Sequence, residues 1–144
     1  MPKYDLSTVT CTRTPEEIVA MAKSIEGTGV LGEFAPALFE YLPYEHAKSF
    51  LKEGVTSEQW EDARGEGNDA KLRNQFQHYA EWWKEKIENE RAISVWRAKG
   101  QFALRMWLAG MSEWEEIFHT DGGYYTRDAY ETARELCGLA ELEA

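Results

Sequence analysis

The sequence predicts a mainly α-helical protein, folded as a compact single-domain bundle of five to seven helices with one long central helix and a short extended N-terminal segment. Two patterns indicate helices: apolar residues recur every three or four positions, and capping motifs precede several of these runs. A third observation concerns the core. The 144 residues include 6 Trp, 7 Tyr and 6 Phe, enough aromatic surface to bury a core in one domain spanning residues 1–144.

The N-terminal segment, residues 1–13, is expected to be an extended arm. Its stretch KYDLSTVTCT is rich in β-branched residues but does not alternate cleanly as a strand would. We expect it to pair with the region Gly123–Tyr125. The first helix should begin at Thr14, because Thr14-Pro15-Glu16-Glu17 forms a capping box with Pro at the first helical position. Its apolar face would comprise Ile18, Met21, Ala22 and Ile25.

Residues 33–53 read as two short helices that Pro43 separates, because proline interrupts helical hydrogen bonding. Thr56-Ser57-Glu58-Gln59 then resembles a cap for a further helical turn that carries Trp60. A glycine-rich connection, residues 64–68, leads into the central helix.

The central helix is predicted from about Asp69 to Lys99. Its apolar residues step by three and four along one side, and they are Leu72, Phe76, Tyr79, Trp83 and Ile87. The phase of this stripe is lost near Ala92, and a second stripe begins at Trp96. We place a helix break near Gly100, followed by a helix that resumes over 102–109.

Two short helices complete the prediction. Ser112-Glu113-Trp114-Glu115 resembles a capping box that opens a helix ending near His119. Thr126 can cap a last helix, whose inward residues would be Tyr130, Ala133 and Leu136. The acidic tail 139–144 is expected to fray.

Charge divides the chain into three parts. The central segment from Arg64 to Arg105 holds 9 Lys/Arg against 6 Asp/Glu, whereas residues 1–63 hold 5 against 11 and residues 106–144 hold 2 against 9. The net charge of −10 disfavours unspecific binding to nucleic acid or anionic membranes and favours basic partners.

No motif predicts a reaction, so we expect neither an enzyme nor a cofactor. Glu116 and His119 have the Glu-x-x-His spacing of helical metal sites, but those sites require a second copy and further carboxylates. Gly27-Thr28-Gly29-Val30-Leu31-Gly32 matches G-x-G-x-x-G without the strand and βαβ unit that a dinucleotide site requires. An ordinary loop between helices explains these glycines better, and no metal site is predicted.

Cys11 and Cys137 are expected to be free thiols, the usual state in a reducing compartment. A disulfide joining the two ends of the chain is the alternative. The start of the sequence has no signal-peptide pattern and no apolar run is long enough to span a bilayer. We therefore expect a cytoplasmic protein.

The leading hypothesis is a non-enzymatic acidic protein that binds a basic surface of a partner and thereby inhibits it. Carboxylates surround tryptophans in two places, and exposed tryptophans are frequent binding hot spots. The predicted partner-binding residues are Trp60, Glu61, Asp62, Trp82, Trp114, Glu115 and Glu116. By size and charge alone, the chain is similar to small inhibitors such as anti-restriction, anti-CRISPR and immunity proteins. A homodimer is also compatible with exposed tryptophans.

The alternative is a nucleic-acid-associated protein that uses the basic, aromatic central helix. Basic side chains can follow a phosphate backbone while aromatic rings stack on bases. The residues that would do so are Lys84, Lys86, Arg91 and Arg97. Interspersed glutamates make a solvated helix with local ion pairs the ordinary explanation of this pattern.

Overall fold

The computed structural model describes residues 2–25, 35–64, 68–118 and 126–139. Within these residues it contains eight α-helices, one short 3-10 helix and no strand, which confirms the mainly α prediction. The helices outnumber the five to seven predicted, because three of them have only four or five residues. The buried apolar side chains form one continuous core.

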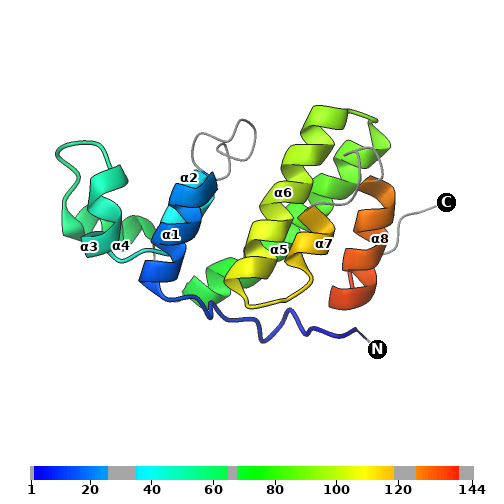
Figure 1. The fold of residues 1–144 in the computed structure, drawn as a ribbon, viewed down its shortest axis with the longest axis horizontal. Helices are drawn as coiled ribbons and strands as arrows, with labels where there is room; N and C mark the ends of the chain where they lie inside the picture. Colours follow the sequence, from blue (N-terminus) through cyan, green and yellow to red (C-terminus); the bar gives the residue numbers. More distant parts are fainter. Residues whose placement is uncertain (1, 26–34, 65–67, 119–125, 140–144) are drawn as a thin grey trace.

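The first half of the chain forms short helices that gather at one end of the molecule (Figure 1). These are α1 (Pro15–Ile25), α2 (Ala35–Phe39), α3 (Tyr44–Ala47), η2 (Lys48–Phe50) and α4 (Ser57–Arg64).

Two predicted capping boxes start α1 and α4. The amide of Glu17 donates to Thr14 Oγ1 at 3.2 Å, and the amide of Thr14 donates to Glu17 Oε1 at 3.4 Å. Thr56 and Gln59 exchange the same two bonds at 3.0 and 3.1 Å. Because each pair satisfies two amides that a helix start leaves unbonded, these local motifs fix where both helices begin.

The segment predicted as one central helix from about Asp69 to Lys99 forms a hairpin of two helices, so that prediction is wrong. α5 (Asn68–Glu88) ends eleven residues before Lys99, and α6 (Ala92–Leu108) runs without a break through the buried Gly100. The break expected at Gly100 therefore falls at residues 89–91, where the apolar stripe loses its phase. The reversal lets the two stripes face each other, with the rings of Phe76 and Phe102 5.2 Å apart.

α7 (Trp114–Phe118) and α8 (Thr126–Cys137) pack against this hairpin, on the other side of it along the long axis from α3 and α4 (Figure 1). Trp83 on α5 and Tyr130 on α8 meet edge to face, with their ring centroids 5.2 Å apart. Both side chains are almost completely buried, so this contact lies at the centre of the C-terminal half of the protein.

The N-terminal arm, residues 2–13, has no helix and passes along one end of the helices (Figure 1), but it is not fully extended, because it turns where the amide of Thr8 donates to the carbonyl of Asp5 at 3.2 Å. Its amides donate to helix-end carbonyls, Tyr4 to Leu136 at 2.7 Å and Thr12 to Leu108 at 2.9 Å, and its Leu6 and Val9 are buried. The arm thus bonds to the ends of α6 and α8. The predicted pairing partner, Gly123–Tyr125, lies outside the described residues.

Glu113 interacts with this arm. Its carboxylate accepts hydrogen bonds from Lys3 Nζ and Tyr4 Oη. The predicted capping box placed Ser112 at the start of the next helix, whereas α7 begins at Trp114 and the amide of Ile117 donates to the carbonyl of Glu113 at 3.2 Å. No described helix is long and apolar enough to cross a membrane.

Candidate partner-binding surface

Three of the predicted binding residues, Trp60, Glu61 and Asp62, lie on α4 at one end of the molecule (Figure 1). α4 buries none of its residues completely. Trp60 is half-buried, and its indole N–H donates to the carbonyl oxygen of Leu42 at 2.7 Å. This bond fixes the position of the ring and leaves part of its surface in contact with solvent.

The carboxylates of α4 divide into engaged and unpaired groups. Glu61 accepts from the amide of Tyr44 at 3.2 Å and from Arg64 Nη1 at 3.0 Å. Glu58 and Asp62 are exposed, and neither makes a hydrogen bond or ion pair with another described residue. They are four residues apart on one helical face, where like charges repel each other.

The same end of the chain carries aromatic and aliphatic side chains that are only half-buried. We call residues 44–64, comprising α3, η2 and α4, the α3–α4 lobe. Ala47 is its only fully buried residue. Its half-buried apolar side chains are Tyr44, Phe50, Leu51, Val55 and Trp60. The lobe therefore presents apolar rings beside unpaired carboxylates.

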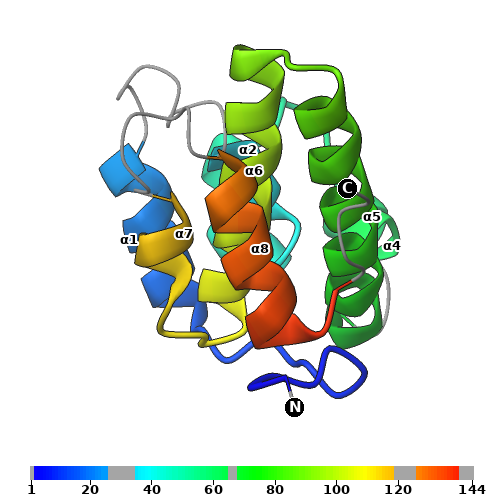
Figure 2. The same ribbon diagram turned by 90° about the vertical axis from the view of Figure 1, so that its right-hand side faces the viewer.

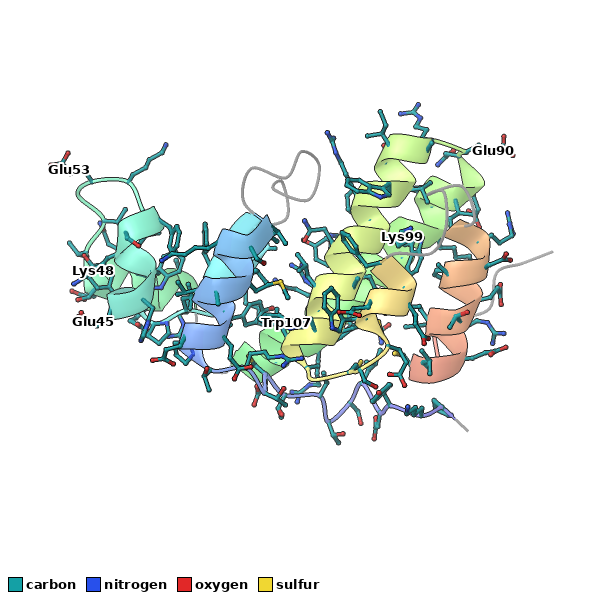
Figure 3. All side chains as sticks on the ribbon, in the orientation of Figure 1. Glu45, Lys48, Glu53, Glu90, Lys99 and Trp107 are labelled. Carbon is teal, nitrogen blue, oxygen red and sulfur yellow. The ribbon has the colours of Figure 1, made fainter. Side chains whose placement is uncertain are left out.

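Further charged residues project from the lobe (Figure 3). Glu45 and Lys48 form an exposed ion pair at 3.3 Å, whereas Glu53 is exposed without such a partner among the described residues. Over residues 44–64 there are five acidic and three basic side chains, a net charge of −2. The exposed carboxylates give this end of the molecule an acidic surface.

Trp82, the second of the three predicted tryptophan anchors, lies on α5 and is half-buried. Its ring packs against the ring of Tyr79 at a centroid distance of 5.9 Å, and both belong to the edge of the core. Trp82 therefore has an intramolecular packing role and is placed on a different helix from the acidic lobe.

The other predicted cluster, Trp114, Glu115 and Glu116, lies on α7. Trp114 is half-buried against the core, and both carboxylates are exposed. Glu116 also has an interaction within the chain. α4 and α7 are well separated in both ribbon views (Figures 1 and 2). The structure therefore does not bring the two acidic clusters onto one face.

The residues of the nucleic-acid alternative lie around the turn of the α5–α6 hairpin. Lys84 and Lys86 are half-buried on α5, whereas Arg91 and Arg97 are exposed. Within residues 81–97 these four cations accompany four glutamates, 81, 85, 88 and 90, which gives zero net charge. A surface without excess positive charge offers little attraction for a phosphate backbone.

The predicted metal and nucleotide motifs provide no site in the described part of the chain. His119 and the glycine motif 27–32 lie outside it. Within it, no group of three or more His, Cys, Asp or Glu side chains is arranged to hold a metal ion.

Sequence reasoning missed a buried polar network around Arg105, which is only 1% exposed. Its guanidinium donates to Gln75 Oε1 at 3.2 Å and to the carbonyl of Gln101 at 3.1 Å, and it lies over the ring of Tyr79 at 4.2 Å. Tyr41 also donates to Gln75 Oε1. Burial lowers the pKa of Arg105 and raises that of Tyr41.

This network connects the two halves of the chain. The side-chain amide of Gln75 donates to Glu40 at 2.7 Å, and Glu40 lies 3.8 Å from Lys71 Nζ. Hydrogen bonds thus run from the half-exposed carboxylate of Glu40 through Gln75 to the buried guanidinium of Arg105. They hold the segment that follows α2 against the α5–α6 hairpin. One feature of the sequence could have indicated a buried cation: the segment 92–108, which forms α6, is largely apolar and contains basic residues but no acidic residue.

Lys99 is a second cation that the structure buries, with 1% of its surface exposed. Burial lowers the pKa of its amine. Since Lys99 and Arg105 both belong to the segment that is basic in sequence, part of that segment's positive charge lies in the interior. The exposed surface of the hairpin is consequently less basic than the sequence suggests.

Both cysteines are free thiols, and neither forms part of a reactive site in the described residues. Cys137 is buried, and burial raises its pKa to about 12. Cys11 is half-buried, and burial raises its pKa as well. Both thiols are therefore protonated, unreactive groups at neutral pH.

No protein-family model matches this chain, and no curated protein or solved structure shows significant similarity to it.

Proposed function

We propose that this chain is a non-enzymatic binding protein whose α3–α4 lobe occupies a basic surface on a partner protein. The observation that carries the proposal is the pair Glu58 and Asp62, which are exposed and have no ion-pair partner among the described residues, on a helix with no buried residue. They flank the half-exposed ring of Trp60.

The free energies involved support this assignment. Like charges spaced i, i+4 destabilise a helix by roughly 0.2–0.5 kcal/mol, so Glu58 and Asp62 weaken α4 in the free protein. A cationic partner would convert this repulsion into attraction, and burial of the adjacent ring would add apolar contact. The arrangement is therefore better suited to a complex than to the isolated chain.

The proposed partner surface carries Lys or Arg side chains around a contact for an aromatic ring. Such surfaces include the nucleic-acid channels of enzymes and effector complexes, so binding there would inhibit the partner. This is the role of the anti-defence and immunity inhibitors that the size and charge of the chain suggest. The α7 cluster is not included, because it lies on another part of the molecule.

Affinity capture with the full chain tests this proposal. We would compare the wild type with the neutral variant E58Q/D62N and with E81Q/E135Q, a matched control that removes two exposed carboxylates from α5 and α8. We expect a partner from the native host that wild type and control capture and that E58Q/D62N loses. Its binding should weaken as salt rises towards several hundred millimolar, because exposed charges are then screened.

Equal capture by all three proteins would contradict the role of α4. A labelled oligonucleotide distinguishes the alternative function. The proposed inhibitor should not shift the oligonucleotide by itself but should compete with it for the captured partner. A direct shift that weakens steeply with salt would instead support nucleic-acid binding.

A further inference from the structure

The α3–α4 lobe contributes little to the common core of the protein. Among its 21 residues only Ala47 is fully buried. Its aromatic side chains are only half-buried, and one of them, Phe50, stacks on Phe39 of α2 outside the lobe with ring centroids 4.4 Å apart. Burial of apolar surface is the main stabilising term in folding, so the lobe has a small stabilisation of its own.

Few contacts attach the lobe to the rest of the molecule. α4 packs mainly against α3, and α3 contacts α1. The indole of Trp60 donates to the carbonyl of Leu42, which Pro43 separates from the lobe. Phe50 stacks on Phe39 of α2, and His46 lies 4.0 Å from Glu16 of α1. Tyr44 Oη donates to the carbonyl of Val55 within the lobe itself. Most of its described hydrogen bonds are thus internal.

The C-terminal half differs in the burial of its side chains. Trp83, Phe102 and Tyr130 are almost completely buried and contact one another across α5, α6 and α8. None of these residues contributes to the lobe. Loss of the lobe would leave this group of aromatic contacts intact.

We propose that the α3–α4 lobe opens as a separate unit while α5, α6 and α8 remain folded, and that the partner stabilises its closed form. Proteins open in cooperative units, and regions with few buried apolar contacts open most readily. The second half of the inference rests on the proposed function. A partner that contacts Trp60 and the acidic face of α4 would bind the closed form of the lobe and not the open form. Its binding would therefore shift the equilibrium between the two forms towards the closed one.

Native-state hydrogen exchange of the full chain tests the opening directly. We expect the amides of α3 and α4 to be at least about 100-fold less protected than those of α6, because they exchange through local opening. Low concentrations of urea should accelerate exchange in α6 more strongly than in the lobe. Equal protection and equal urea dependence in the two regions would overturn the proposal.

Two alanine variants sharpen this test. W60A removes the ring that anchors α4, and we expect it to abolish protection in the lobe while changing that of α6 less than about 2-fold. W83A removes a core ring and should lower protection in α5, α6 and α8 together. W60F, which keeps a ring but loses the bond to Leu42, should weaken protection only in the lobe. Comparable losses in α6 and the lobe for either Trp60 variant would contradict separate opening.

The captured partner supplies the final test. We expect it to raise protection throughout α3 and α4, and no such rise on binding would overturn the second half of the inference. The two proposals fail in different experiments. Uniform protection in the free protein refutes separate opening and leaves α4-dependent capture standing, whereas undiminished capture by E58Q/D62N refutes the binding role and leaves separate opening standing.

Discussion

At the scale of single residues, the helix ends show where sequence rules are followed and where they are not. α6 and α8 end with glycines in the left-handed region, Gly110 at φ 76° and Gly138 at φ 68°. After α5 the corresponding left-handed position is held by Glu90 at φ 51°, the only non-glycine residue with positive φ among the described residues. Its amide donates to Ile87 at 3.1 Å, and that of Arg91 donates to Lys86 at 3.5 Å. This is the hydrogen-bond pattern of a Schellman cap, in which glycine is the usual residue.

Replacing Glu90 by glycine should therefore stabilise the protein. The left-handed conformation costs a residue with a Cβ atom roughly 1 kcal/mol more than it costs glycine. We expect E90G to raise the free energy of unfolding by about that amount, measured by urea titration. N89G is the matched control and should destabilise, because Asn89 precedes the left-handed position. A loss of stability in E90G would show that the Glu90 side chain is needed at the turn.

Glu113 makes the arm sensitive to acid. Hydrogen bonds from Lys3 and then Tyr4 lower the pKa of its carboxyl from 4.5 to about 2. A carboxyl with a lowered folded-state pKa stabilises the protein above its unfolded pKa, and this contribution is lost as pH falls towards the folded value. The ionised Glu113 thus stabilises the arm at neutral pH and does so progressively less between about pH 5 and pH 2.

The variant E113Q should show this dependence. We expect it to be less stable than the wild type at pH 6, with a difference that shrinks as pH falls to 3, measured by urea titration at each pH. K3M removes the first cause of the pKa shift and should reproduce part of the effect. A difference that stays constant with pH would mean that the carboxylate is not held in its ionised form by the arm.

At the scale of elements, the α5–α6 hairpin combines an apolar seam with one buried cation. Phe76 and Phe102 meet in the seam, and Arg105 lies one turn further along α6. Its hydrogen-bond acceptors are uncharged oxygens of Gln75 and Gln101. Removal of a buried charge together with its volume is costly, whereas an apolar side chain of similar size can often replace it.

Two substitutions at Arg105 should therefore differ in cost. R105A leaves a cavity and removes the donor to Gln75, and we expect it to lower the free energy of unfolding by roughly 3 kcal/mol. R105M fills most of the space, and Gln75 still accepts from Tyr41, so a loss of about half that size is expected. Urea titration measures both. Equal losses would show that the guanidinium bonds, and not the volume, hold α2 on the hairpin.

At the scale of the whole molecule, the N-terminal arm joins segments that are far apart in sequence. It bonds to the ends of α6 and α8, and its last residue, Arg13, donates to the carbonyl of Trp107 at 2.8 Å. A Cβ atom on Gly110 would lie 2.6 Å from Thr12 Oγ1, so the arm passes close to the end of α6. The arm is therefore part of the structural core.

Alanine substitutions in the arm test that role. L6A removes a buried side chain and should lower the free energy of unfolding by roughly 2–3 kcal/mol. T10A alters an exposed side chain of the same arm, and its effect should stay within about 0.5 kcal/mol. Thermal or urea unfolding distinguishes the two. If L6A were as mild as T10A, the arm would be a peripheral segment.

The helical class and both capping boxes were predictable because local spacing decides them. The apolar faces of α1 and α5 were read correctly for the same reason. The hairpin was not predictable, because its turn at Glu90 contains neither glycine nor proline. For the candidate site, the sequence analysis named Trp60, Glu61 and Asp62 but not which of the α4 carboxylates are already bound within the chain. That α4 has unpaired carboxylates while Glu113 is bound by the arm depends on which distant segments meet.

The sequence by itself determined the class of fold, the starts of α1 and α4 and the overall acidity, since these follow from composition and from residues three or four positions apart. Tertiary structure alone decided that Lys99 and Arg105 are internal, that α4 and α7 lie apart, and that residues 2–13 bond to helix ends. These outcomes depend on contacts between residues far apart in the chain. Such contacts are set by packing of the whole core, which short-range sequence spacing does not determine.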